Sequence, residues 1–333
     1  MSRRFATLSL ALLAAFACSS NKKDAESNTG FRAALLTPGE ITDQSWNGGA
    51  YQGLLRLRDS LGAEISNIQT KTPAEFDENF RQYGSQGYTL VFGHGFEFQD
   101  AAARAAAEFP KTNYVVTSGT TSGPNLSGIR FGFEEPSYAA GVLAALWSKS
   151  NVIGAIGGTE LPPVKASFEA YANGAKSVKP NIRVLTSYVG NWDDAGAGKE
   201  QALAQIGQGA DIIFQNADAA GLGVFQAARE TKKAMVFGSN GDQNNVAPEV
   251  TLASVMIDLP LAFMKIGQMI KDGTFKAQVF VFGESTGVVK LLINPAMRAS
   301  IPPATLAVVD SVENSLRNGT LVIPVASRDS AAK

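Results

Sequence analysis

The sequence has few of the side chains on which disulfides, metal sites and nucleic-acid surfaces depend. Its 333 residues include one cysteine, Cys18, and one histidine, His94. A single cysteine cannot form an internal disulfide, and only carboxylates remain as metal ligands, without the spacing of a calcium loop. The formal net charge is −1, so the chain lacks the excess of positive charge that is typical of nucleic-acid-binding proteins. We therefore expect no metal, no cofactor and no nucleic-acid partner.

An apolar run with a positively charged start stands at the N-terminus. Arg3 and Arg4 precede the run from residue 8 to residue 16, which is too short to span a bilayer of about 30 Å as a helix. This pattern predicts a signal peptide over residues 1–17. The run ends at Ala15-Phe16-Ala17-Cys18, which resembles a bacterial lipobox in which the cysteine becomes the lipidated first residue. The residues at 15 and 16 depart from the commonest lipobox, and a buried thiol is the structural alternative for Cys18.

The chain after Cys18 is polar and then becomes rich in apolar residues. Residues 19–30 contain no bulky apolar side chain, so residues 18–30 are expected to be a lipidated, flexible tether. About 300 residues follow, without a second long hydrophobic segment, and a chain of that length forms one globular unit of one or two domains.

Short β-rich runs alternate with helical patterns along the rest of the chain. The first series predicts strands at 31–37, 64–68, 88–93, 114–118 and 128–131, with helices at 46–61, 73–86 and 99–109. The second series predicts helices at 136–148, 164–178, 195–206 and 221–231, with strands at 152–157, 182–189, 211–215 and 234–238. Strands separated by helices of this length predict parallel sheets that are covered on both faces.

The two series predict an α/β fold with two doubly wound lobes. The chain is expected to leave the first lobe near residues 133–136, to return near 258–260 with a helix at 261–272, and to cross a third time near 277–284. These crossings divide the chain into an N-terminal lobe of residues 31–134 plus 259–277 and a C-terminal lobe of residues 135–258 plus 278–333. Ligands of open parallel sheets bind at the carboxyl ends of strands, so the loops after the strands are the candidate site.

Several motifs together resemble one bacterial family. The run Asp43-Gln44-Ser45-Trp46-Asn47, the segment at 131–149, Ile156-Gly157-Gly158 and Gly241-Asp242-Gln243 are similar to the basic membrane protein family, the purine nucleoside receptor A type of substrate-binding lipoprotein. The resemblance covers nearly all of residues 31–324, in order. It implies a type I periplasmic-binding-protein fold with a three-stranded hinge, and a solute receptor for an ABC importer. The implied ligand is a nucleoside whose base lies between aromatic rings.

The resemblance also implies ligand-binding positions. Asp43 and Asn47 stand where the family has polar contacts, and Trp46 and Phe214 stand where it has the two rings. Ser118 and Asn240 replace acids of the family pattern, and Asp258 replaces its lysine, which favours a different hydroxyl pattern or a related heterocycle. The complete set of candidate ligand-binding residues is Asp43, Trp46, Asn47, Phe96, Ser118, Phe214, Asp218, Asn240, Asp242 and Asp258.

Structural roles are open for the same residues. The alternatives are a helix cap for Asp43 and Asp218, packing for Trp46 and Phe214, and a turn for Asn240 and Asp242. For His94, the alternative to ligand contact is hydrogen bonding within its loop.

The sequence favours a binding protein over an enzyme. No G-x-S-x-G motif accompanies the single histidine. Asp43 and Asp242 fall on opposite predicted lobes, which suits closure on a ligand better than the fixed acid–base geometry of a carboxylate-dependent hydrolase. We expect a monomeric receptor, anchored by lipid to a membrane of the cell envelope and facing the periplasm or exterior, that delivers a small molecule to an ABC permease. The alternative is a ligand-sensing receptor that feeds a membrane signalling protein.

Overall fold

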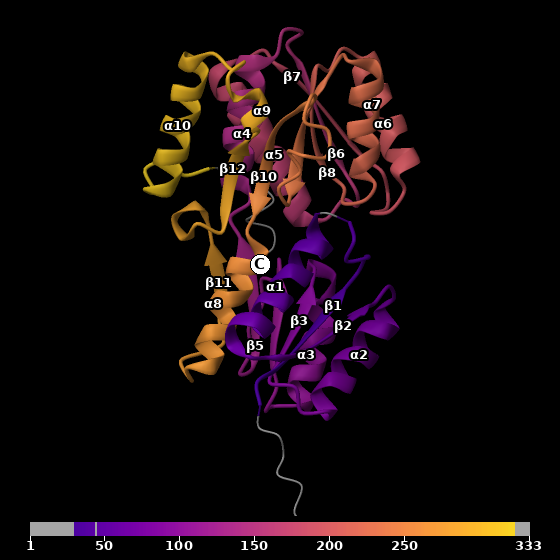
Figure 1. Ribbon diagram of the computed structural model, residues 1–333, viewed down its shortest axis with the longest axis vertical. Coiled ribbons are helices and arrows are strands. Elements are labelled where there is room, and N and C mark those ends of the chain that lie inside the picture. Colours follow the sequence, from indigo (N-terminus) through magenta and orange to yellow (C-terminus); the bar gives the residue numbers. More distant parts are fainter. Residues whose placement is uncertain (1–29, 44, 324–333) are drawn as a thin grey trace, which may run out of the picture. The chain divides into compact units, whose positions relative to one another are not determined.

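Residues 30–43 and 45–323 are described by the computed structural model in Figure 1. The predicted signal peptide, Cys18 and all of the predicted tether except Gly30 lie outside the described residues. Residues 31–43 and 45–323 belong to one compact unit, which contains two six-stranded sheets.

The first sheet has the strand order β11-β5-β4-β3-β1-β2, and all its strands are parallel. Its strands are β1 (Arg32–Thr37), β2 (Glu64–Gln69), β3 (Leu90–His94), β4 (Asn113–Thr117), β5 (Leu126–Phe131) and β11 (Val279–Phe282). The helices associated with it are α1 (Trp46–Leu61), α2 (Pro73–Ser85), α3 (Gln99–Glu108) and α8 (Leu259–Lys271), with a 3₁₀ turn η1 (Phe96–Phe98) before α3.

The second sheet has the order β12-β10-β9-β8-β6-β7. Its strands are β6 (Val152–Gly157), β7 (Arg183–Tyr188), β8 (Ile212–Asn216), β9 (Met235–Asn240), β10 (Thr251–Ile257) and β12 (Val289–Ile293). Strand β12 is antiparallel to β10, and the other pairs are parallel. The remaining helices are α4 (Glu134–Trp147), α5 (Pro162–Val178), α6 (Ala195–Gly207), α7 (Gly221–Thr231), α9 (Pro295–Arg298) and α10 (Pro303–Arg317), with a 3₁₀ turn η2 (Glu284–Thr286).

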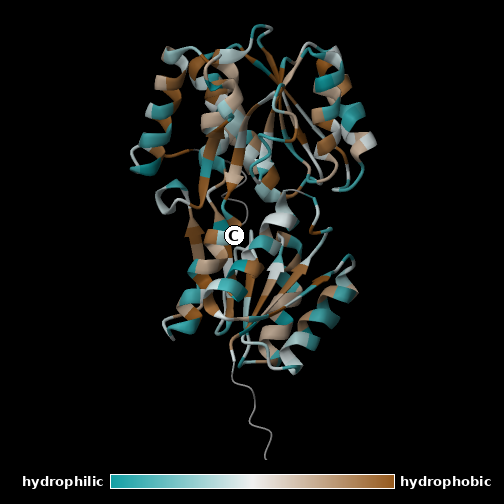
Figure 2. Cartoon of the chain, viewed as in Figure 1, coloured by the Kyte–Doolittle hydropathy of each residue, from teal (hydrophilic) through white to brown (hydrophobic). Residues whose placement is uncertain are grey.

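The central strands are apolar on both faces because helices cover both sides of each sheet. In β1, Ala33 and Leu35 enter one hydrophobic cluster, whereas Ala34 and Leu36 enter another. Successive side chains of a strand point to opposite faces, so each face of β1 is buried by a different layer. Figure 2 shows the result as hydrophobic strands beneath helices whose outer faces are hydrophilic.

Local sequence signals set where several helices begin and end. Thr72 and Glu75 form a capping box at the start of α2, with Pro73 in the first turn. The side chain of Asp258 accepts a hydrogen bond from the Leu261 backbone N–H and so caps α8. Helix α1 ends at Leu61 and is followed by Gly62, whose φ of 70° favours glycine.

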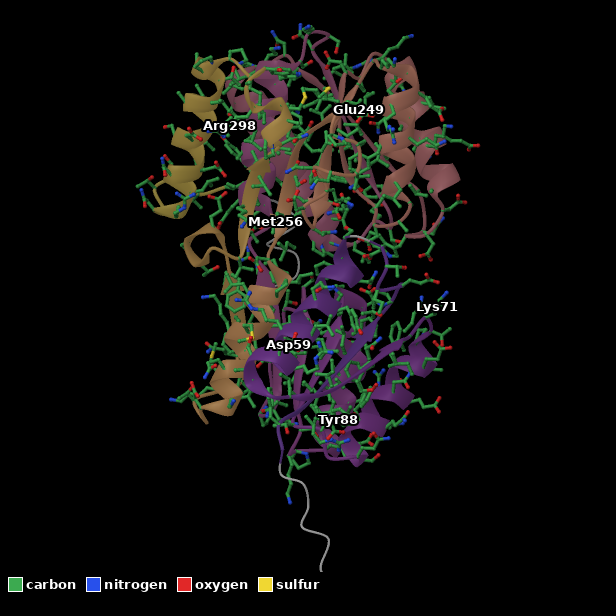
Figure 3. The ribbon with its side chains drawn as sticks, in the orientation of Figure 1. Asp59, Lys71, Tyr88, Glu249, Met256 and Arg298 are labelled. Carbon is green, nitrogen blue, oxygen red and sulfur yellow. The ribbon has the colours of Figure 1, made fainter. Side chains whose placement is uncertain are left out.

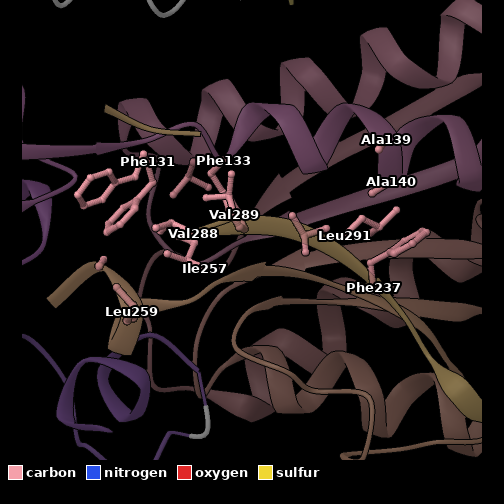
Figure 4. Packing of buried hydrophobic residues seen from close by; sticks show 14 of the residues in the cluster. Phe131, Phe133, Ala139, Ala140, Phe237, Ile257, Leu259, Val288, Val289 and Leu291 are labelled. Carbon is pink, nitrogen blue, oxygen red and sulfur yellow. The ribbon is translucent and has the colours of Figure 1, made fainter. Parts of the chain in front are cut away.

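The chain passes between the two sheets three times: between β5 and α4, between β10 and α8, and between β11 and β12. Buried apolar side chains gather at these passages, and Figure 4 shows them as one group: Phe131, Phe133, Ile257, Leu259, Val288 and Val289. Strand β11 pairs with β5, so residues 279–282 belong to the first sheet, whereas the predicted C-terminal lobe began at residue 278.

Polar side chains lie at the surface, among them the exposed Lys71, which is labelled at the edge of the first lobe in Figure 3. Within residues 30–43 and 45–323, no helix combines the length and the apolar character needed to cross a membrane.

Candidate ligand-binding site

A cavity of about 460 Å³ lies at the carboxyl ends of strands from both sheets. From the first lobe, its walls include Trp46, Glu97, Ser118 and Phe131, and from the second lobe, Trp192, Asn216, Asp218 and Asn240. The volume is within the range of sites for small organic molecules.

Trp46 forms an aromatic wall whose orientation is fixed by His94. The two rings stack with centroids 3.9 Å apart and an interplanar angle of 22°. The Nε2–H of His94 donates to the Trp46 carbonyl oxygen at 2.9 Å, and Nδ1 therefore accepts from the Thr117 hydroxyl at 2.9 Å. Burial lowers the pKa of His94 to about 3, so the ring is neutral. His94 acts as a hydrogen-bonding support behind Trp46, in agreement with the structural alternative.

Trp192 forms a second aromatic wall, which depends on a glycine. A Cβ atom at Gly158 would lie 2.2 Å from Cε3 of Trp192. Only a residue without a side chain therefore allows the indole to lie against the loop that follows β6.

The polar wall is a hydrogen-bonded group at the ends of β8 and β9. The Asn240 amide donates from Nδ2 to Oδ1 of Asn216 at 3.3 Å and to Oδ1 of Asp218 at 3.4 Å. From the first lobe, the Ser45 hydroxyl is 3.4 Å from the same Asp218 oxygen and 3.2 Å from the Ser239 carbonyl oxygen. These contacts join the two lobes next to the cavity.

Backbone strain is concentrated at the same place. Ser118, Asp218 and Asn240 have φ values of 57°, 49° and 63°, and all three line the cavity. Elsewhere in the described chain, only Asn151 and Lys232 adopt a positive φ without being glycine. Left-handed backbone at a non-glycine residue is costly and gathers at functional sites, so this concentration supports a ligand-binding role.

The charged lining is mainly acidic. Burial raises the pKa of Asp218 well above its usual range, and the charges of Asp43 and Glu97 raise it further. Burial also raises the pKa of Glu97. Arg130 donates to the carboxylate of Glu134, so that pair balances its own charge.

The structure places part of the predicted site on the cavity. The residues of that set that line it are Trp46, Phe96, Ser118, Asp218 and Asn240. Those that do not line it are Asp43, Asn47, Phe214, Asp242 and Asp258.

Asp43 and Asn47 shape the loop that carries Trp46. The Asp43 carboxylate accepts backbone hydrogen bonds from Ser45 at 2.9 Å and from Asn47 and Gly48 at 2.8 Å. The Asn47 amide also donates to Asp43 at 2.7 Å. Asp43 therefore satisfies the free N–H groups at the start of α1, the capping role left open by the sequence.

The other three residues have structural contacts away from the cavity. Phe214 is fully buried and packs against Phe168 and Tyr171, which is the core role rather than the predicted ligand-stacking one. Asp258 caps α8. Asp242 is exposed and accepts from the Asn244 backbone N–H within its own turn.

Several lining residues are not among the predicted ones, including Glu97, Arg130, Trp192 and the segment Leu161–Val164. Glu97 had a usable signal because it lies three residues after the end of β3, beside the candidate Phe96. Trp192 had none, since its position depends on the contact with Gly158.

A family model described as "ABC transporter substrate-binding protein PnrA-like" (Bmp) matches residues 31–324. The chain belongs to this family. It is accordingly an extracytoplasmic solute-binding protein of an ABC transporter, with a ligand and a permease as partners, and the family is one of binding proteins rather than enzymes.

Two curated relatives match nearly the whole chain. The ABC transporter nucleoside-binding protein BmpA of Lactococcus lactis is 31% identical over 89% of this chain and 90% of its own length. A purine-binding protein of Brucella abortus is 27% identical over 87% of this chain and 82% of its own.

A solved structure confirms the fold. An ABC transporter solute-binding protein from Aeropyrum pernix superposes with a TM-score of 0.81 at 19% identity, covering 88% of this chain and 94% of that one. The predicted type I periplasmic-binding-protein fold is therefore confirmed.

Proposed function

We propose that this family member binds a nucleoside, or a related ligand that joins a heterocycle to a hydroxylated group, in the cavity. One observation carries the proposal: the ends of β4, β8 and β9 present polar side chains on left-handed backbone to a cavity that aromatic side chains also line. Aromatic faces suit the flat, apolar surfaces of a base, and convergent polar groups suit its hydroxyl and amino groups.

The aromatic and the polar side chains of the cavity would bind different parts of the ligand. Trp46, held by His94, would stack on the heterocycle with one face, while Trp192 would close the cavity from the second lobe. Asn216, Asn240 and Ser118 offer both donors and acceptors to hydroxyl groups. Support also comes from the names of the relatives, which describe nucleoside binding in one and purine binding in the other.

The test is a direct binding measurement. Isothermal titration of the purified protein against purine and pyrimidine nucleosides should give a saturable signal, and ligand at 100 times its Kd should stabilise the fold by about 2.7 kcal/mol. Trp46→Ala should weaken binding by at least about tenfold, because it removes a stacking face and its buried area. The matched control is Trp147→Ala, since Trp147 lies at the end of α4 and does not line the cavity. Absence of binding by every nucleoside would remove the proposal.

We also propose that the chain is anchored to the membrane through a lipid on Cys18 and delivers its ligand to the permease from there. The apolar run and the cysteine that ends it support this anchor. Cys18→Ser should shift the protein from the membrane fraction to the soluble fraction and abolish incorporation of labelled fatty acid. Unchanged membrane retention of the variant would contradict the lipid anchor.

A further inference from the structure

The cavity contains acids that no base balances. Among the described residues that line it, the charged ones are Glu97, Arg130, Glu134 and Asp218. Arg130 pairs with Glu134. This leaves Glu97 and Asp218 as carboxyl groups facing the ligand space without a cationic partner from the described lining.

Asp218 has an oxygen available to a ligand. The residue is 5% exposed, and both of its hydrogen bonds, from Ser45 and Asn240, end on Oδ1 at 3.4 Å. Within the part of the chain that the structure describes, Oδ2 accepts no hydrogen bond. Because a buried carboxylate is costly unless it is paired, this oxygen marks a position where a donor or a cation would be strongly held.

The surroundings make the carboxylate form of Asp218 more costly still. Asp43 on the loop before α1 and Glu97 on the loop after β3 raise its pKa through their negative charge. His94, behind Trp46, is neutral because burial lowers its pKa to about 3. The Arg130–Glu134 pair contributes no net charge. Burial and these negative charges favour the protonated form of Asp218, and a positive group beside it would stabilise the carboxylate form instead.

The aromatic walls suit a cation as well. Trp46 and Trp192 line the cavity together with Phe96, Phe131 and Phe133. Aromatic faces attract positive charge, tryptophan most strongly. The same cavity thus joins aromatic faces to unpaired carboxyl groups.

We infer that the natural ligand is an organic cation, a heterocycle with a positively charged ring nitrogen or a protonated amine, whose charge lies against Asp218 and Glu97. This inference rests on the proposed function and narrows its ligand class.

Two isomers provide a matched test. 1-Methyladenosine is a cation near neutral pH, whereas N6-methyladenosine has the same carbon and nitrogen content and is neutral. Titration of both at about pH 7.5 should show the cation binding at least about tenfold more tightly, the size of an ion pair in a partly screened site. Lowering the pH to about 6 should weaken binding of the cation, because protonated Asp218 must first release its proton.

Variants connect the effect to the carboxyl groups. Asp218→Asn keeps the side-chain shape and a residue type that accepts left-handed backbone, and it should reduce the preference for the cation to about threefold or less. Glu97→Gln should reduce it in the same direction. Asp242→Asn, on the exposed turn outside the cavity, is the control and should keep the full preference. Thermal unfolding of each variant establishes that it is folded.

The outcomes separate the inference from the function on which it rests. If N6-methyladenosine or unmodified nucleosides bind as well as 1-methyladenosine or better, the inference is wrong while nucleoside binding stands. If affinity for the cation does not change with Asp218→Asn and Glu97→Gln, the inference is also wrong. If no nucleoside of either charge binds, the proposed function is wrong and the inference is overturned with it.

Discussion

Glu284 is a carboxyl group that the fold buries at a passage between the two sheets. It lies in η2, between β11 and β12, with 4% of its surface exposed, and neither of its oxygens accepts a hydrogen bond from the described residues. Burial, together with the nearby carboxyl groups of Glu313 and Glu135, raises its pKa from 4.5 to about 8, although Arg317 opposes the shift. The charged form is therefore the unfavourable one in the folded state.

The raised pKa of Glu284 makes the folded protein less stable at alkaline pH. Because the folded state holds the proton more tightly than the unfolded state, the contribution of Glu284 to stability is complete below about pH 4.5 and is lost as the pH rises to about 8. One pKa unit corresponds to about 1.4 kcal/mol, so this shift lowers the free energy of unfolding by at most about 5 kcal/mol at alkaline pH.

Urea unfolding of wild type and Glu284→Gln between about pH 5 and pH 9 measures the contribution of Glu284 to the free energy of unfolding. The amide does not ionise, so the difference between the two proteins should move in favour of the variant by several kcal/mol as the pH rises. The backbone N–H of residue 284, which donates to Glu135, is kept in the variant. Glu78→Gln, on the exposed face of α2, is the control and should follow wild type. Parallel stability curves for wild type and Glu284→Gln would refute the reasoning.

Three further substitutions test close contacts and a cap. Gly158→Ala places a Cβ 2.2 Å from the Trp192 ring and should weaken ligand binding by about tenfold through displacement of that wall, as measured by titration calorimetry; unchanged affinity would contradict the role of Trp192. Gly141→Ala places a Cβ 1.9 Å from the Tyr171 carbonyl oxygen where α4 meets α5, so thermal unfolding should show a loss of about 1–3 kcal/mol or more from overpacking. Thr72→Ala removes the cap of α2 and should cost about 1 kcal/mol in urea unfolding, whereas no loss would mean that water satisfies the same N–H groups.

The strand and helix order was predictable wherever a strand is followed by a covering helix. Helix α1 at 46–61 and strand β6 at 152–157 have the predicted bounds. Strands β10 and β12 were not predicted. No helix separates β9 from β10, and β12 is antiparallel and joins the sheet only after the chain has left and returned. The alternation of strands and helices along the sequence therefore does not indicate these two strands.

The location of the candidate site could be predicted from the sequence, but the side chains that line it could be predicted only in part. Strand ends identify the loops, and Ser118, Asp218 and Asn240 do line the cavity. A position near the end of a strand does not tell whether the side chain faces the cavity or the core. The side chain of Phe214 faces the core. Asp43 does not line the cavity, and its carboxylate accepts hydrogen bonds from the free N–H groups at the start of α1.

The three passages between the sheets also have a consequence for how the molecule is made. Strand β11, at residues 279–282, is the edge of the first sheet, yet it is synthesised after β6 to β10 of the second. The first lobe therefore stays incomplete, with the open edge of β5 and the α8-binding face of α1 uncovered, until most of the chain has been translated. Unpaired edges and exposed apolar faces promote aggregation, so a chain truncated before β11 should aggregate more readily than the complete chain.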